Sequence, residues 1–182
     1  LPRIARGEVA WCQGYSEPGA GSDLASLTTR AEDRGDHYLV NGSKIWTSGA
    51  QYADWIFCLV RTDPRAAKHE GISFLLFSMD APGVTVKPIR LINGESPFCQ
   101  TFFDDVRVPK ADLVHKANHG WTVAKRLLQH ERSGLLALAS ADTMGPLERI
   151  QPSLPLPELA RHYAGGRRIE DPVLRADIID NE

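Results

Sequence analysis

The sequence contains three stretches whose residue types and spacing could do chemistry, and the first is WCQGYSEPGAGSD at residues 11–23. It places three glycines and a proline around Glu17, with a serine on either side of the Gly19–Gly21 cluster. Glycine-rich turns let main-chain N–H groups approach an anionic or flat ligand. The stretch lacks the lysine of a P-loop, and Leu24 stands where a dinucleotide fingerprint needs its third glycine. An ordinary surface turn is the alternative to a ligand-binding loop.

The second stretch is KIWTSGAQYADW at residues 44–55, in which the hydroxyls of Thr47 and Ser48 follow Trp46. An aromatic wall with hydroxyl donors beside it could bind a planar heterocycle that has hydrogen-bonding edges. The alternative is the end of a strand that contributes a tryptophan to the core.

The third stretch is the pair Glu131 and Arg132, which interrupts an apolar helical pattern. At about 100° per residue, Glu131 falls on the edge of the stripe that contains Leu128 and Leu135. A desolvated carboxylate holds its proton more tightly, which suits a base that removes a weakly acidic C–H proton. The alternative is a structural Glu–Arg pair that joins two layers of the fold.

Other classes of function find less support in the sequence. His115 and His119 have a metal-like spacing, but they precede the helical pattern and no third ligand is evident, so we expect no metal site. No Gly-x-Ser-x-Gly motif indicates a serine hydrolase. The formal net charge of −2 gives no basic excess for nucleic acid, and no apolar run approaches the roughly 20 residues that span a bilayer. The odd, widely spaced cysteines (Cys12, Cys58 and Cys99) favour reduced thiols and a cytoplasmic location.

Strands must position the first two stretches. The Asn41-Gly42 pair between two short β-prone runs predicts a hairpin. Apolar or alternating runs predict strands at 37–46, 54–61, 72–79, 84–91 and 100–108. Because no helical segment separates these runs, we expect an antiparallel β-barrel or sandwich.

A helix must position the third stretch. From Gly120 the apolar spacing becomes helical and continues to about residue 144, where Gly145-Pro146 should end the helix. A proline-rich connection at 151–158 and a further helical segment at 171–180 follow. The fold class we expect is therefore α+β, with a β domain followed by helices.

Several of these motifs, in this order, resemble the acyl-CoA dehydrogenase family. YSEPGAGSD resembles the family's Thr/Ser-Glu-Pro-x-x-Gly-Ser-Asp segment, and KIWTS resembles its Lys-x-Trp-x-Thr/Ser stretch. FFDDVRVPKADLV is similar to its strand that ends in Val-x-Val-Pro. HGWTVAKRLLQHERSG is similar to its Gly-Trp-x-x-Ala entry into the first long helix of the C-terminal domain. The resemblance covers residues 8 to about 140.

The resemblance implies a middle β-barrel domain over residues 1–115, which binds flavin and acyl-CoA. Residues 116–182 would then be the start of a C-terminal α-helical domain. The family's N-terminal helical domain and the rest of its helical bundle would lie outside this sequence. We therefore expect a segment of a longer protein, inactive on its own.

The resemblance also implies FAD as the cofactor. The positions that match the family's flavin contacts are Gln13, Tyr15, Ser16, Trp46, Thr47 and Ser48. The first three would supply main-chain and hydroxyl contacts to the flavin ring. The indole of Trp46 would pack against the ring, Thr47 would offer its backbone, and the Ser48 hydroxyl would point toward flavin N5. Ser22 would lie against the pantetheine or thioester end of an acyl-CoA.

The implied reaction is α,β-dehydrogenation of an acyl-CoA thioester, in which a carboxylate removes the α-proton and the β-hydrogen leaves as hydride to flavin N5. In a subset of the family the base stands at the position of Glu131, and Arg132 would orient the substrate or neutralise charge; in most members the base would lie beyond this sequence. Fatty-acid metabolism, an electron-transfer flavoprotein as acceptor and a homotetramer are implied as well. The alternatives are a non-catalytic or truncated structural subunit and an acyl-CoA oxidase.

Overall fold

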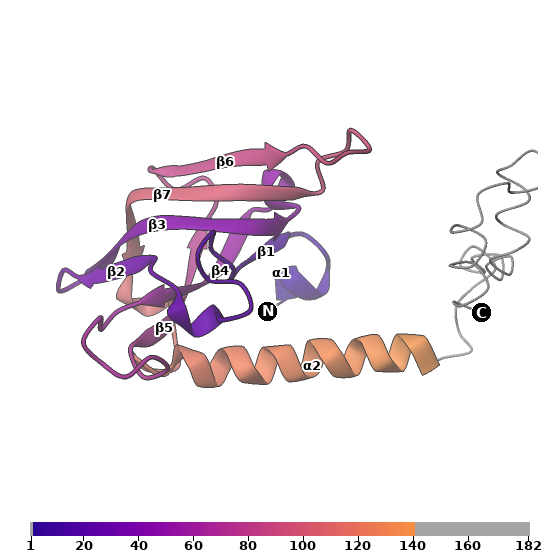
Figure 1. Cartoon of the computed structure of the whole chain (residues 1–182). Coiled ribbons are helices and arrows are strands. Elements are labelled where there is room, and N and C mark those ends of the chain that lie inside the picture. The colour runs from indigo at the N-terminus through magenta and orange to yellow at the C-terminus, as the bar shows by residue number, and fades with distance from the viewer. Residues whose placement is uncertain (1, 141–182) are drawn as a thin grey trace, which may run out of the picture. The chain divides into compact units, whose positions relative to one another are not determined.

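The computed structural model describes residues 2–140, and their side chains as far as residue 133. Within the described part of the chain, eight strands lie in the first 114 residues, and one long helix follows them (Figure 1). The elements are α1 (Pro2–Ala5), β1 (Trp11–Gly14), η1 (Leu24–Ser26), β2 (Arg30–Asp33), β3 (His37–Ser48), η2 (Ala50–Tyr52), β4 (Trp55–Arg61), β5 (Ile72–Ser78), β6 (Val84–Ile89), β7 (Phe98–Pro109), η3 (Lys110–Asp112), β8 (Leu113–Val114) and α2 (Gly120–Ser140).

The strands form a single sheet in the order β6-β7-β3-β2-β4-β5-β8, and β1 pairs with β4 off this path. Among the described residues the two ends of the path, β6 and β8, do not pair with each other, so the sheet is open and no closed barrel forms. Most neighbours are antiparallel, as predicted, but β1 and β2 both run parallel to β4. The expected fold class, a β domain followed by a helix, is confirmed, except that the sheet is open and does not close into a barrel.

The hairpin predicted at Asn41-Gly42 is wrong, because both residues lie inside β3. The chain turns between β2 and β3 at Gly35, which has a φ of 91°. Gly42 has a φ of 143°, and a Cβ there would lie 2.7 Å from the Cα of Thr29. Asn41 instead bonds to β7, where its Nδ2 donates to Oδ1 of Asp105 at 2.8 Å. The pair therefore lies at a register shift between β3 and β7 and not at a turn.

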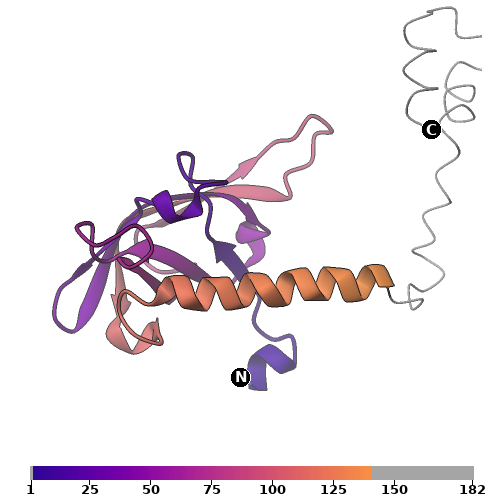
Figure 2. The same cartoon turned by 60° about the horizontal axis from the view of Figure 1, so that its bottom comes forward.

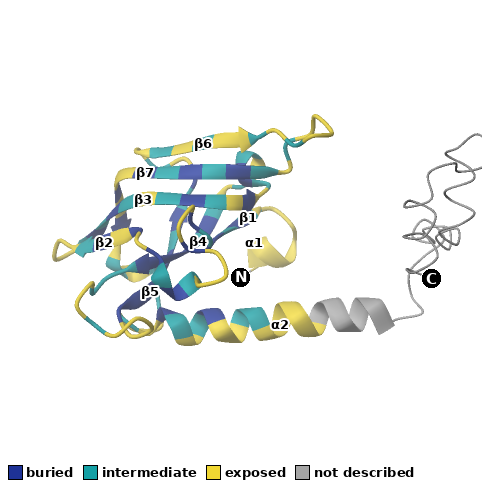
Figure 3. Ribbon diagram, viewed as in Figure 1, coloured by how far each residue is buried: buried dark blue, intermediate teal, exposed yellow. Residues whose placement is uncertain are grey.

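Buried residues lie mainly along the central strands (Figure 3). β4 and β5 each have one fully buried face and a second face that is buried or half-buried, which explains their nearly continuous apolar runs. One core cluster includes all three cysteines, and burial raises the pKa of the Cys12 thiol to about 12 and that of Cys58 to about 11. By contrast β6, which contains Pro88 and forms one end of the sheet order, has no buried residue.

The first turns of α2 pack against the sheet (Figure 2). Ala124 is buried in a second core cluster with Leu59 and Phe74 of the sheet, and Trp121 packs against this cluster. The helix predicted to begin at Gly120 is thus confirmed as far as Ser140, whereas its predicted end and the segments at 151–158 and 171–180 lie outside the described residues. No helix in residues 2–140 is both long and apolar enough to cross a membrane.

A polar cluster fixes the start of α2 beside β5. Thr62 Oγ1 lies 2.6 Å from both Ser73 Oγ and Asn118 Oδ1, and the N–H of Asn118 donates to Ser73 Oγ at 2.8 Å. A Cβ at Gly120 would fall 2.4 Å from the carbonyl carbon of Ser73, so only glycine allows this approach. The chain divides into two compact units at His130, and α2 passes from the first into the second.

Candidate cofactor and substrate site

The structure brings the glycine-rich loop and the tryptophan strand together. The backbone N–H of Ile45 donates to the carbonyl of Ser16 at 2.8 Å. The loop therefore lies directly against β3, one residue before Trp46. Two stretches that are far apart in the sequence form neighbouring walls at this point.

β3 bulges at Trp46. Lys44 pairs with Thr101 of β7 whereas Thr47 pairs with Cys99, so three steps along β3 match two along β7. Trp46 has a φ of 61°, a left-handed conformation that non-glycine residues rarely adopt. Bulges and strained residues of this kind gather at functional sites, where they redirect a side chain. Here the bulge leaves the Trp46 side chain 53% exposed.

The exposed indole of Trp46 packs against a phenylalanine ring, and two hydroxyl residues follow it in β3. Phe98 of β7 contacts the Trp46 ring edge-to-face, with centroids 6.1 Å apart and planes at 83°. Ser48 is exposed at the end of β3, so its hydroxyl is open to a ligand. Thr47 is fully buried, and its Oγ1 has no hydrogen-bond partner among the described residues. A ligand that approaches from solvent therefore cannot contact the Thr47 side chain.

On the side of the loop, β1 leads into it through Gln13 and Tyr15. Gln13 is half-buried and stands in register with Phe57 of β4. The ring of Tyr15 is buried and contacts Phe57 and Phe74 edge-to-face, with centroid distances of 6.0 and 6.2 Å. Tyr15 therefore anchors the start of the loop in the core, next to the half-buried Ser16.

A buried ion pair, which the sequence analysis did not predict, holds the loop to β3. Lys44 is 0% exposed and Glu17 is 5% exposed. Lys44 Nζ donates to Glu17 Oε1 at 2.8 Å and to the carbonyl of Tyr15 at 3.1 Å. The Glu17 carboxylate also accepts bonds from Thr28 N at 2.6 Å, Thr28 Oγ1 at 2.8 Å and Thr29 N at 2.9 Å. Both charges are thus well hydrogen-bonded, which a buried pair requires.

These contacts keep Glu17 ionised. Burial alone would raise the pKa of Glu17, but the charge of Lys44 and the donors on Lys44, Thr29 and Thr28 lower it to about 2. Glu17 is therefore a structural anion and no proton acceptor at neutral pH. The alternation of β3 carried the signal for this pair, because Lys44 continues the inward series of Tyr38 and Val40. An inward lysine needs a carboxylate, and Glu17 supplies it.

The tip of the glycine turn is exposed and narrow. The N–H groups of Glu17 and Ala20 each donate to the other's carbonyl at 3.0 Å, which closes the turn. Ser22 follows on the exposed tip. Asp23 then forms an ion pair with Lys68, and this hydrogen bond is the main cause that lowers the pKa of Asp23. A ligand can reach Ser22 from solvent.

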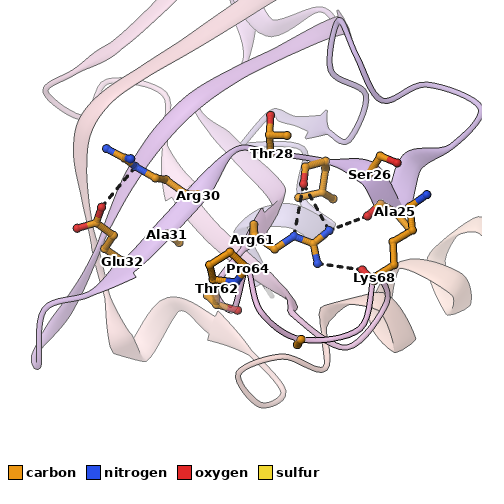
Figure 4. A pocket seen from close by; sticks show the side chains of 12 residues that line it. Ala25, Ser26, Thr28, Arg30, Ala31, Glu32, Arg61, Thr62, Pro64 and Lys68 are labelled. Atoms are coloured by element: carbon orange, nitrogen blue, oxygen red, sulfur yellow. Dashed lines mark hydrogen bonds and ion pairs between the residues drawn. The ribbon is translucent and has the colours of Figure 1, made fainter.

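A cavity of about 780 Å³ lies between residues 25–32, which follow the turn in the sequence, and residues 61–68 (Figure 4). Three cations, Arg30, Arg61 and Lys68, and a single carboxylate, Glu32, are among its lining residues. Arg30 Nε lies 3.4 Å from Glu32 Oε1. Because Lys68 pairs with Asp23, the excess positive charge of the lining is that of Arg61, and it favours an anionic ligand.

Arg61 connects the walls of this cavity. Its guanidinium donates to the carbonyls of Ala25 at 2.6 Å, Lys68 at 2.9 Å and Leu27 at 3.4 Å. Among the described residues no carboxylate forms an ion pair with Arg61, and burial lowers its pKa. The sequence analysis did not single out Arg61, because its role depends on carbonyl groups and these carry no sequence signal.

Glu131 and Arg132 lie on α2, in the second compact unit, and both side chains are exposed. Their roles in catalysis stay predictions. His115 and His119 are exposed, with ring centroids 5.5 Å apart. Within the described residues no group of three or more His, Cys, Asp or Glu side chains could hold a metal ion.

The sheet and its loop match known proteins. A family model described as acyl-CoA dehydrogenase, middle domain, matches residues 12–106. The acyl-CoA dehydrogenase FadE34 of Mycobacterium tuberculosis is 46% identical over 151 residues, which cover 82% of this chain and 21% of that protein. The structure of the Tcur3481-Tcur3483 steroid ACAD is 40% identical, with a TM-score of 0.73 over 98% of this chain and 44% of that one.

A glutaryl-CoA dehydrogenase from Mycobacterium smegmatis, solved in complex with FADH2, is 32% identical, with a TM-score of 0.54 over 62% of this chain and 28% of that one. The chain spans less than half the length of each of these three proteins. The glycine loop, β3 and the cavity all fall within the residues that the family model matches. The chain belongs to the acyl-CoA dehydrogenase family.

Proposed function

We propose that the protein is an FAD-dependent acyl-CoA dehydrogenase, an oxidoreductase that introduces an α,β double bond into an acyl-CoA thioester. The observation that carries this proposal is the hydrogen bond between Ile45 and Ser16, because it sets the glycine-rich loop against β3, one residue before the exposed Trp46. A flat aromatic face, a glycine turn and the exposed hydroxyl of Ser48 suit a planar ring that has polar edges.

The residues present fit an isoalloxazine ring. The strained bulge at Trp46 has an evident use if the indole packs on that ring. The contacts that we propose come from the hydroxyls of Ser16 and Ser48, the latter toward N5, and from the segments of Gln13, Tyr15 and Thr47. The relative solved with FADH2 supports this assignment. When bound, FAD supplies the acceptor for the β-hydrogen.

For the substrate, we propose that Ser22 lies against the pantetheine or thioester end of the acyl-CoA. Coenzyme A carries several phosphate groups, and the neighbouring cavity offers Arg30, Arg61 and Lys68 to an anion. The Asp23–Lys68 ion pair joins the turn to this cavity. A thioester at the turn would therefore leave its charged end within reach of the cationic lining.

Glu131 is the base that we propose for removal of the α-proton, which its carboxylate would hold after the step. Because Glu131 is exposed in this chain, the substrate and further segments would have to exclude water from it. Arg132 would orient the substrate or offset charge. A glutamate outside this sequence is the alternative base.

The family resemblance supports the remaining parts of the proposal. Residues 1–115 would form the middle domain and residues 116–182 the start of the helical domain. We expect an electron-transfer flavoprotein as electron acceptor, a homotetramer, a cytoplasmic location and a place in fatty-acid metabolism.

The test is expression of the complete reading frame, followed by flavin analysis and anaerobic titration with acyl-CoA thioesters. We expect bound FAD whose absorbance at the flavin maximum is bleached by a suitable thioester. Glu131→Gln should abolish bleaching and leave FAD bound. Rapid peroxide formation in air would favour an acyl-CoA oxidase. A protein that binds no flavin, or an unaffected Glu131→Gln variant, would contradict the corresponding part of the proposal.

A further inference from the structure

Three consecutive residues of the loop are bound by two consecutive residues of β3. The carbonyl of Tyr15 and the carboxylate of Glu17 accept bonds from Lys44 Nζ at 3.1 and 2.8 Å, and the carbonyl of Ser16 accepts from Ile45 N at 2.8 Å. Lys44 therefore contacts the residues on both sides of Ser16 in the loop. On its own strand, Lys44 is two residues from Trp46.

Glu17 extends this connection beyond the turn. Its carboxylate accepts bonds from the backbone N–H groups of Thr28 and Thr29, and Thr29 is itself buried. The two charged side chains thus hold three segments at fixed distances: the loop before the turn, the segment after it and β3. No ligand that approaches from solvent could contact Lys44, because its side chain is 0% exposed.

Stability alone does not explain a charged pair at this place. Apolar side chains of similar volume often stabilise a fold as well as a buried ion pair does. An apolar residue at position 44, however, would have no donor for the carbonyl of Tyr15 or the carboxylate of Glu17. What the ion pair adds is a defined position of the loop main chain relative to β3.

We propose that Lys44 and Glu17 are positioning residues, which fix the loop main chain at Ser16 relative to Trp46 and so the geometry of the surface on which a planar ring would bind. Neither residue touches the ligand. The proposal rests on the proposed function, since that ring would be the flavin. It adds to the proposed function the two residues that hold the loop and β3 in a fixed relative position.

The experiment compares the complete polypeptide with Lys44→Met, with the uncharged double variant Glu17→Gln/Lys44→Met, and with Lys110→Met. Lys110 is a matched control, because it also forms an ion pair, with Asp33, but it lies outside the site. Each protein is titrated with FAD, and its flavin spectrum and melting temperature are recorded. Exchange of the Ile45 amide proton is measured on the flavin-free proteins.

We expect Lys44→Met to weaken FAD binding roughly tenfold or more, since small displacements of positioning groups have effects of this size. The double variant should regain thermal stability relative to Lys44→Met, because it leaves no unpaired buried charge. Its FAD affinity should stay low, and its Ile45 amide should exchange faster than in the wild type. Lys110→Met should match the wild type in FAD affinity and in exchange.

Two results would overturn the inference. One is wild-type FAD affinity in a folded Lys44→Met variant. The other is a double variant that regains both stability and affinity, because the pair would then serve folding alone. Failure of the proposed function looks different: the wild type itself would bind no FAD, although the Ile45 amide would still report how the ion pair holds the loop.

Discussion

Acid should destabilise this protein through one identifiable carboxylate. Although burial would raise the pKa of Glu17, Lys44 and the donors of Thr29 and Thr28 bring it from 4.5 down to about 2. A difference of about 2.5 units corresponds to about 3 kcal/mol of folding free energy, at 1.36 kcal/mol per unit. Because the pKa is lower in the folded state, this contribution is present above about pH 4.5 and is lost as the pH falls toward about 2.

The assay is urea unfolding, followed by tryptophan fluorescence, at a series of pH values from 7 to 2.5. The wild type is compared with the Glu17→Gln/Lys44→Met variant, which removes the titrating group without leaving a lone buried charge. Asp23, Asp33 and Asp36 also have lowered pKa values, mainly through side-chain hydrogen bonds with Lys68, Lys110 and His37, respectively, but both proteins contain them. The difference between the two curves therefore isolates the ion pair.

We expect the wild type to lose more stability than the double variant between pH 5 and pH 2.5, by about 2 kcal/mol, since the full loss is reached only below the folded-state pKa. Parallel curves over this range would refute the argument. They would mean that Glu17 has the same proton affinity in the folded and the unfolded chain, in spite of its donors.

Three substitutions test other features of the structure. Gly120→Ala should lower the free energy of unfolding by about 1–3 kcal/mol, because its Cβ would meet the backbone of Ser73 at 2.4 Å, and urea unfolding measures this. Trp46→Ala should weaken FAD binding in a titration while the melting temperature stays close to that of the wild type, because the indole is 53% exposed. Arg61→Met should weaken acyl-CoA binding and reduce its dependence on salt, as titrations at two ionic strengths would show; an unchanged salt dependence would remove the cavity from the substrate site.

The sequence predicted the strands well where one residue pattern dominates. The apolar runs at 54–61 and 72–79 correspond closely to β4 and β5, since strands that are buried or half-buried on both faces are apolar along most of their length. The Asn41-Gly42 pair gave a wrong hairpin prediction, although its local preference for a turn is real. A hydrogen bond from Asp105 to the Asn41 side chain and the close approach of Thr29 to Gly42 keep the pair inside β3. Tertiary contacts of this kind leave no local signal.

The candidate site was predictable in composition and only partly in geometry. The order of motifs placed Ser16 and Trp46 on two stretches, and the hydrogen bond at Ile45 now shows these stretches side by side. The bulge that exposes the indole depends on the register between β3 and β7, which no single-sequence pattern specifies. Lys44 could have been noticed as an inward charge, whereas the carbonyl groups around Arg61 could not.

The exposed end of the sheet at β6 has a consequence for how the protein behaves in concentrated solution. An unpaired strand edge can template the addition of a strand from another molecule, which leads to fibrils. Pro88 removes one backbone donor from this edge, and the charge of Lys87, which lies over the ring of Phe102, disfavours close approach of a second chain. The edge at β6 can therefore stay exposed without pairing with a strand of another molecule.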